Sequence, residues 1–285
     1  MIEVLSTGSG MTLQDAGRAG WGRFGVPQGG AMDARSMALA NHLLGNRPDA
    51  PVLEIALQGA RLQVVQTTWL ALAGADHCSS LAAPAARRFE AGAVLTFDQK
   101  APGRYAYLAV PGGFEAKTWF GSASTDHRNG MGQLLTKGAR LGGLLKEPRV
   151  STEGVACRRP SEAPEPLPEK RAHFAVFRGP QYEVFSREAR QILVETEWTL
   201  SLRSDRTGYR LEGASLPVPE SIPSEPVLPG SFQIPGGGAP IVTMPDGPTV
   251  GGYAKIAVLR AVDLCAFAQC PPQTKIQFSW IDSII

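Results

Sequence analysis

The sequence predicts a mainly β protein with short strands joined by tight turns, and three observations lead there. The chain holds 32 glycines and 23 prolines among 285 residues, far above the usual share of about 12%. The excess has no period, which excludes collagen, and a hydrophobic content of 43% excludes a disordered chain. Short apolar runs recur about every 8–12 residues, as in sandwiches and barrels, and helical patterns are few.

The expected strands are runs of Val, Leu, Ile and aromatic residues bounded by Gly, Pro or Asp. In the first half of the chain they cover residues 51–57, 61–65, 69–73, 93–97 and 105–110. In the second half they cover residues 174–177, 198–202, 241–244, 255–259 and 275–281.

One helix is predicted over residues 33–44. Asp33 suits the N-cap, Gly45 a left-handed residue after the last turn, and Pro48 prevents continuation. Two shorter helices are expected over 181–193 and 263–269, where they would cover a sheet.

Prolines suggest the domain organisation. The segment 147–171 is rich in proline and charge and lacks apolar periodicity, so it is predicted as a linker between an N-terminal β domain (1–146) and a C-terminal β domain (172–285). A second proline-rich stretch, 217–240, interleaves apolar residues with its prolines and is expected to be an ordered loop.

Charge and composition exclude several classes of function. Lys and Arg number 28 against 26 Asp and Glu, a balance that does not favour a nucleic acid or an anionic membrane as partner. There is no signal-peptide pattern and no apolar stretch near 18 residues, so a cytoplasmic protein that acts on a small molecule or a protein partner is expected. The cysteines (Cys78, Cys157, Cys265, Cys270) form no CxxC pair and the four histidines are scattered, so neither disulfides nor a metal site is predicted.

Nucleotide motifs give little support for a cofactor bound by this chain. Gly20 to Gly25 matches GxGxxG, but Val26-Pro27 follows where a dinucleotide-binding turn would start a helix. The chain has no GxxxxGK[ST] and no GxSxG. Any ATP site is therefore expected elsewhere.

Three polar, glycine-rich blocks remain as candidates for chemistry: residues 12–33, 204–211 and 245–255. Reaction at an amide needs donors for a developing oxyanion, a positioned base, and backbone that approaches closely. The donors would be Arg18, Arg206 and Lys255, and the bases or orienting carboxylates Asp15, Asp33 and Asp205. The alternative, which composition alone favours, is that Asp15–Arg18 and Asp205–Arg206 are turn-stabilising ion pairs.

Seven ordered motifs also carry a resemblance. They are TLQDAGRAGWGRFGVPQGGAMD (12–33), LEIALQGARL (53–62), ALAGAD (71–76), YLAVPGGF (107–114), GSASTD (121–126), SDRTGYRLEG (204–213) and VGGYAKIAVL (250–259). Together they resemble the biotin-dependent carboxyltransferase-like family, which includes allophanate hydrolase subunit 2, the C subunit (PxpC) of the ATP-dependent 5-oxoprolinase, and the KipA proteins. Thr207 stands where the family pattern has Met, and Gln28 where small or aliphatic residues are common.

The resemblance implies a cyclophilin-like β-barrel architecture and a protein that works with a KipI-like B subunit (PxpB) and an A subunit (PxpA). Such an assembly opens 5-oxo-L-proline to L-glutamate with ATP, which the complex uses. No cofactor is expected on this chain alone. One alternative is carboxyl transfer from carboxybiotin, carried on a separate chain, to a urea-like amide. Another is a KipA-type regulatory subunit that binds a KipI-like partner without turnover.

The blocks and the resemblance together nominate the site residues. The expected catalytic residues, which bind an oxyanion or carboxylate and relay protons, are Asp15, Arg18, Asp205 and Arg206. The expected substrate-binding residues are Gln14, Gly29, Gly30, Asp33, Tyr209, Gly251, Gly252, Tyr253 and Lys255.

Overall fold

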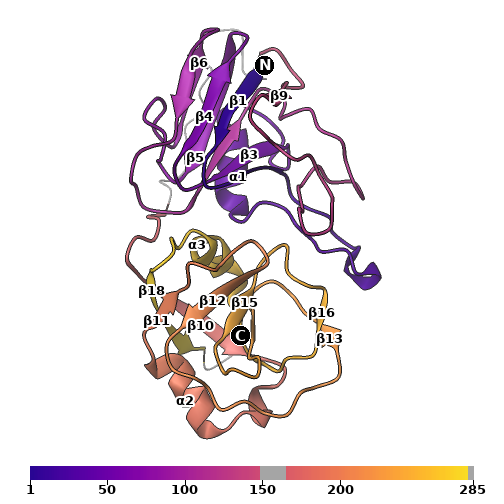
Figure 1. Ribbon diagram of the computed structural model, residues 1–285, viewed down its shortest axis with the longest axis vertical. Helices are drawn as coiled ribbons and strands as arrows, with labels where there is room; N and C mark the ends of the chain where they lie inside the picture. Colours follow the sequence, from indigo (N-terminus) through magenta and orange to yellow (C-terminus); the bar gives the residue numbers. More distant parts are fainter. Residues whose placement is uncertain (148–164, 282–285) are drawn as a thin grey trace. The chain divides into compact units, whose positions relative to one another are not determined.

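The computed structural model describes residues 1–147 and 165–281, so most of the expected linker lies outside the described residues. Contacts between residues divide the chain into two compact units (Figure 1). The first consists of residues 1–18 and 29–167, and the second of residues 19–28 and 168–285. Residues 19–28, expected in the N-terminal domain, thus group with the second unit, and the strand that begins at Arg171 already includes the last residue of the expected linker.

Two sheets and a helix form the first unit. The four-stranded sheet has the order β7-β4-β1-β9, with β7 (Val94–Thr96), β4 (Ala60–Val64), β1 (Ile2–Thr7) and β9 (Arg140–Leu141). The five-stranded sheet has the order β2-β3-β8-β5-β6, with β2 (Met11–Gln14), β3 (Val52–Ala56), β8 (Tyr105–Ala109), β5 (Thr68–Gly74) and β6 (Ala85–Phe89). Its neighbouring strands are antiparallel.

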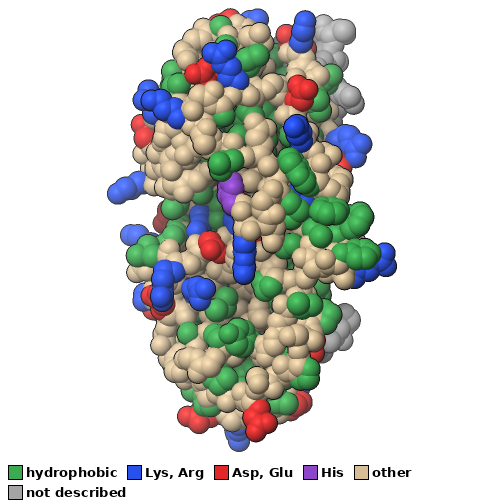
Figure 2. All heavy atoms as spheres, turned by 45° about the vertical axis from the view of Figure 1, so that its right-hand side comes forward, with side chains coloured by type: hydrophobic (Ala, Val, Ile, Leu, Met, Phe, Trp, Pro, Cys, Tyr) green, Lys and Arg blue, Asp and Glu red, His purple; other side chains and the backbone are tan. Residues whose placement is uncertain are grey.

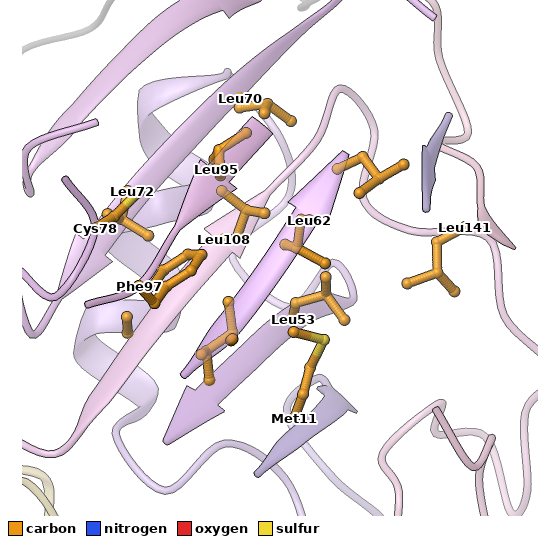
Figure 3. Close-up of a cluster of buried hydrophobic side chains, with 14 of the residues drawn as sticks. Met11, Leu53, Leu62, Leu70, Leu72, Cys78, Leu95, Phe97, Leu108 and Leu141 are labelled. Carbon is orange, nitrogen blue, oxygen red and sulfur yellow. The ribbon is translucent and has the colours of Figure 1, made fainter. Parts of the chain in front are cut away.

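The core of the first unit is formed by side chains from both sheets. Leu62 and Leu95 come from the four-stranded sheet, and Leu53, Leu72 and Leu108 from the five-stranded one (Figure 3). All five are fully buried. Side chains alternate between the faces of a strand, so β4 buries every second residue while β5, covered on both faces, is buried through its middle.

The helix α1 (Ala34–Leu43) packs on the five-stranded sheet, with most of its contacts to β5 and β8. The Asp33 side chain accepts hydrogen bonds from the Arg35 and Ser36 amides, and Gly45 has a φ of 67° just beyond the helix. The predicted start and end of this helix are therefore confirmed, since both depend on local residues that can be recognised in the sequence.

A closed barrel forms the second unit, as the resemblance predicts. Its strand order is β10-β17-β14-β15-β12-β11-β18, with β10 (Arg171–Arg178), β17 (Lys255–Leu259), β14 (Ser231–Gln233), β15 (Ile241–Thr243), β12 (Gly208–Glu212), β11 (Trp198–Leu200) and β18 (Lys275–Trp280). The parallel pair β10–β18 closes it. Aromatic rings fill the interior: Phe232 meets Phe278 edge to face at 4.9 Å between ring centroids, and Phe267 contacts Phe174 and Tyr209.

Smaller elements flank the barrel. The helix α2 (Arg187–Glu195) contacts β18, and α3 (Leu264–Ala268) carries Phe267. A separate two-stranded sheet joins β13 (Glu225–Pro226) to β16 (Val250–Gly251), and we call it the β13–β16 flap (Figure 1).

Three expectations about these elements need correction. The helix expected over 181–193 begins at Arg187, because the Ser186 side chain caps it by accepting from the Ala189 amide, and residues 182–184 form a separate 3-10 turn. The stretch 217–240 is ordered but contains the strands β13 and β14. The strand β12 occupies much of the block 204–211, whose polar residues obscured its pairing with β15.

Candidate functional site

The predicted site residues fall into both units, and each group is described within its own unit. The first unit holds Gln14, Asp15, Arg18, Gly29, Gly30 and Asp33. The second holds Asp205, Arg206, Tyr209, Gly251, Gly252, Tyr253 and Lys255.

Asp15, just past the end of β2, is the centre of a hydrogen-bond cluster in the first unit. Its Oδ1 accepts from the hydroxyls of Ser122 and Ser124, both at 2.5 Å, and from the Gly17 amide at 2.8 Å. Its Oδ2 accepts from the Ala123 amide at 2.6 Å. Hydrogen bonds to a carboxylate are among the stronger ones in proteins, so Asp15 ties the loop 121–126 to the turn 15–17.

The serines of this cluster were not among the predicted site residues. Ser122 and Ser124 are fully buried, and the Ser124 hydroxyl also accepts from the Asp15 amide at 3.0 Å. The motif GSASTD contributed to the resemblance, but nothing in its spacing places these hydroxyls beside a carboxylate more than 100 residues earlier. A buried Asp requires donors, which is the one signal that points to nearby hydroxyls.

Arg18 and Gln14 are also buried and bind the same loop. A guanidinium nitrogen of Arg18 donates to the carbonyl of Ser124. The Gln14 side-chain amide donates to the Thr12 hydroxyl at 3.0 Å and to the Thr125 carbonyl at 3.1 Å. Asp15, Arg18 and Gln14 are therefore brought together around residues 122–125.

The glycines of the first block bring a second backbone segment against this turn. Gly30 has a φ of 90°, and a Cβ there would lie 3.0 Å from the carbonyl carbon of Ala16. The Ala31 amide donates to the Asp15 carbonyl at 3.0 Å. Gly29 also has a positive φ. Glycine at position 30 thus allows this segment to pack against the turn 15–17.

An open cavity of about 370 Å³ lies beside the turn. Asp15, Ala16 and Gly17 form one part of its wall, and further lining residues include Arg47, Asp49, Gly112, Glu115, Thr118 and Gly121. Arg47 is paired with Asp49 through two hydrogen bonds, at 3.0 and 2.7 Å. The volume is at the lower end of the range of about 300–1,000 Å³ that is usual for small-molecule sites.

The structure gives Asp33 a helix-capping position, supported by a buried network. The Asp33 amide donates to the Tyr107 hydroxyl at 2.7 Å, and that hydroxyl donates to Glu54 at 2.9 Å. Glu54 also accepts from the Met32 amide. Burial, reinforced by the nearby carboxylates, raises the pKa of Tyr107 well above its ordinary value, so the phenol keeps its proton.

In the second unit, one ion pair joins the second and third polar blocks. Arg206 Nε and Nη2 donate to the two carboxylate oxygens of Asp246, at 2.7 and 2.8 Å. The side chains are 16% and 9% exposed, so this fork is largely removed from water. Asp205 instead caps its own turn by accepting from the Thr207 and Gly208 amides. Arg206 is thus paired with Asp246 of the third block, which the site prediction omitted, and not with Asp205, the partner that the sequence suggested.

Tyr209 lies in the barrel core. Its ring is fully buried against Phe267, and its hydroxyl donates to the Ala268 carbonyl at 2.6 Å. This placement indicates a packing residue, because the described contacts occupy both its ring and its hydroxyl.

Lys255, Glu225 and Gln181 form a second polar cluster. Lys255 Nζ lies 2.5 Å from Glu225 Oε1, and Gln181 Nε2 donates to the same oxygen at 2.8 Å. These two bonds, that from Lys255 being the larger effect, lower the pKa of Glu225 below its ordinary value near 4.5. Glu225 and Gln181 were not predicted, because nothing in their local sequence marks them.

The remaining predicted glycines border this cluster. Gly251 pairs with Glu225 in the flap, and a Cβ on Gly251 would lie 2.9 Å from Gln233 Oε1. Gly252 lies against the Ile222 carbonyl. Tyr253 is half exposed.

The sequence predicted no metal site, no disulfide and no membrane-spanning segment, and the described residues bear on each of these predictions. In the described residues, no group of three or more His, Cys, Asp and Glu side chains is placed to hold a metal. Within the same residues Cys78, Cys265 and Cys270 form no disulfide, and Cys157 lies outside them. No helix of residues 1–147 or 165–281 is long and apolar enough to cross a membrane. Lys and Arg side chains are scattered over the face seen in Figure 2.

Sequence comparison finds relatives along nearly the whole chain. It is 34% identical to the C subunit of 5-oxoprolinase from Escherichia coli (strain K12), over 98% of this chain and 90% of that protein. The corresponding protein of Haemophilus influenzae is also 34% identical. The urea amidolyase of Lachancea kluyveri is 30% identical over 97% of this chain, which corresponds to 17% of that longer protein.

Solved structures show the same fold. TTHA0988 superposes with a TM-score of 0.86 at 33% identity over 98% of this chain, which spans about half (55%) of that chain. The Kluyveromyces lactis urea amidolyase gives a TM-score of 0.83 at 27% identity, over 19% of its length. The family model for the carboxyltransferase domain, subdomain A and B, matches residues 24–280. The chain therefore belongs to the carboxyltransferase domain family, as its seven motifs predict.

Proposed function

We propose that this protein is the C subunit of an ATP-dependent 5-oxoprolinase, which opens the lactam of 5-oxo-L-proline to L-glutamate. The observation that carries the proposal is the similarity to the C subunit of the Escherichia coli 5-oxoprolinase, at 34% identity over 98% of this chain and 90% of the relative. Both proteins thus match along almost their full lengths. Similarity to urea amidolyase covers a small part of that protein.

The geometry of the first unit supports a small polar substrate. The lining of the cavity beside Asp15 includes the polar residues Glu115 and Thr118, whereas the Gly17 and Gly112 amides already donate to Asp15 and Asn46. A lactam offers one carbonyl acceptor and one N–H donor, which such a wall can pair. Because both Asp15 oxygens already accept from protein donors, we assign Asp15 to holding the cavity wall.

The Arg206–Asp246 fork of the second unit supports an anion-binding role for Arg206. A guanidinium is always charged and carries five N–H donors in one plane, and a carboxylate along one edge fixes the orientation of that plane. This charge and geometry suit the oxyanion that develops on the lactam carbonyl. We propose this role for Arg206, with Asp205 fixing the turn that carries it.

Partners and cofactors follow from the same proposal. A KipI-like B subunit and an A subunit would complete the enzyme, and the complex would consume ATP. This chain alone would bind no cofactor. Biotin on a separate carrier would enter only with carboxyl transfer as the reaction.

Reconstitution with the A and B subunits tests the assignment of Arg206. We expect Arg206→Ala to lose ATP-dependent glutamate release, by about tenfold or more, because a charged hydrogen bond contributes about 1.5–3 kcal/mol. Arg260→Ala is the matched control, since Arg260 forms the same fork with Asp263 but is half exposed. Circular dichroism and the unfolding midpoint establish that both variants fold. Unchanged turnover in a folded Arg206→Ala protein would remove Arg206 from the site.

A second candidate is carboxyl transfer to a urea-like amide. It is favoured by the family match itself and by the TM-score of 0.83 to the Kluyveromyces lactis urea amidolyase. Bicarbonate incorporation into urea that needs a biotin carrier and is abolished by avidin would decide for it. Tight binding to a B subunit without turnover of any lactam or urea would indicate a KipA-type regulatory role.

A further inference from the structure

Lys255 is a buried cation whose position is fixed by its backbone. The residue is 2% exposed, and its amide donates to Gln181 Oε1 at 3.1 Å while its carbonyl accepts from the Gln181 amide at 3.2 Å. Gly179 makes this approach possible, because a Cβ there would lie 2.2 Å from the Lys255 carbonyl oxygen. The Gly179–Gln181 segment therefore runs directly along β17.

Two donors from this arrangement converge on one oxygen. Lys255 Nζ and Gln181 Nε2 both bind Glu225 Oε1, at 2.5 and 2.8 Å. An ammonium group has three N–H donors. Apart from the Glu225 contact, Nζ finds no acceptor among residues 1–147 and 165–281. Lys255 and Gln181 thus bind a carboxylate, and in this structure that carboxylate is the side chain of Glu225.

The Glu225 side chain is placed so that it can separate from Lys255 and Gln181. Its side chain is 38% exposed, and it belongs to the β13–β16 flap, where it pairs with Gly251 in a sheet of two residues per strand. A partly solvated carboxylate is readily hydrated when released, and an incoming carboxylate would take its place beside the buried ammonium. So short a sheet opens at little cost.

We propose that Lys255 Nζ and Gln181 Nε2 form the binding site for a ligand carboxylate, with Glu225 as the internal carboxylate that the ligand displaces. Glu225 keeps the buried ammonium paired while the site is empty, which avoids the cost of an isolated buried charge. This deepens the proposed function, on which it rests for the ligand: the carboxylate of 5-oxoproline.

Binding to the isolated full-length chain tests the site by isothermal titration calorimetry. The probes are 5-oxo-L-proline and 2-pyrrolidinone, which is the same lactam without its carboxylate. We expect Lys255→Met to weaken 5-oxoproline binding about tenfold or more. Glu225→Gln should strengthen it, because the competing charge is gone. Neither variant should change the response to 2-pyrrolidinone.

Lys275→Met is the matched control, because Lys275 is exposed and its side chain donates only to the Thr199 hydroxyl among the described contacts. The inference is overturned if wild-type protein binds no 5-oxoproline at millimolar concentration, if Lys255→Met binds it normally, or if Glu225→Gln weakens it. Failure of the proposed function looks different: carboxylate binding that depends on Lys255 would remain, while the reconstituted complex would release no glutamate.

Discussion

At the scale of single residues, Asp15 was nominated for catalysis and lies at the centre of a hydrogen-bond cluster. It was selected as a polar residue among glycines, and the structure gives its two oxygens four donors from two separate segments. A carboxylate whose two oxygens both accept from protein donors stabilises the loop around it. Its contribution should therefore be seen first in stability.

We predict that Asp15→Ala lowers the free energy of unfolding by about 3 kcal/mol or more, since several buried donors each lose an acceptor at a cost of about 1–3 kcal/mol. Asp15→Asn should lower the free energy of unfolding by less, because the asparagine side chain keeps one oxygen as an acceptor. Urea denaturation measures both. Asp49→Asn is the control: its pair with Arg47 is exposed, so we expect a loss below about 1 kcal/mol. An Asp15→Asn protein of wild-type stability that has lost turnover would instead make Asp15 catalytic.

Sequence reasoning found individual residues more readily than their partners. Gly30 lies where backbone segments approach closely, Gly29 has a positive φ, and Lys255 is a buried charge; each stood out through its local motif. Ser122, Gln181, Glu225 and Asp246 were missed. Their significance arises from contacts with residues 40 or more positions away, which one sequence does not reveal. Tyr209, expected in a pocket wall, is a core residue because β12 alternates its faces along the barrel.

At the scale of elements, too, signals within a few residues of each other were recognised, and pairings with distant residues were missed. The helix α1 was predicted with its cap, because Asp33 and Gly45 act within a few residues. The strands β14 and β12 were hidden in proline-rich or polar stretches, since their pairing partners lie elsewhere in the chain. Short strands of this kind are defined by the barrel that contains them.

The β13–β16 flap should respond to acid. Because the folded-state pKa of Glu225 is lowered, its ion pair with Lys255 is fully present above the ordinary pKa near 4.5 and is lost as pH falls through the lower folded value. We expect hydrogen exchange of the Val227 amide, which directly follows β13 and donates to the Thr249 carbonyl just before β16, to increase over this acid range relative to the barrel strands.

The control for this prediction is Glu225→Gln, which has no carboxylate at that position. In this variant, the ratio of the amide exchange rate at the flap to that of the barrel strands should not change across the same pH range. An identical acid response in the variant and the wild type would assign the effect to other groups.

At the scale of the whole molecule, composition and motifs predicted the class of fold correctly. The glycine and proline excess indicated many turns, and the structure has two antiparallel sheets in one unit and a closed barrel in the other. The barrel itself was an expectation from the resemblance, because strand order depends on pairings such as the parallel β10–β18 pair. The assignment of residues 19–28 to the second unit had no signal in the sequence.

If this chain is the C subunit of a 5-oxoprolinase, as proposed, the complete enzyme requires it. The most direct test measures glutamate formed and ATP hydrolysed from 5-oxo-L-proline by purified A and B subunits, with and without this protein. We predict that glutamate appears only when all three are present, in proportion to the ATP consumed. Glutamate formation at the same rate without this chain, or none in the complete mixture, would contradict the claim.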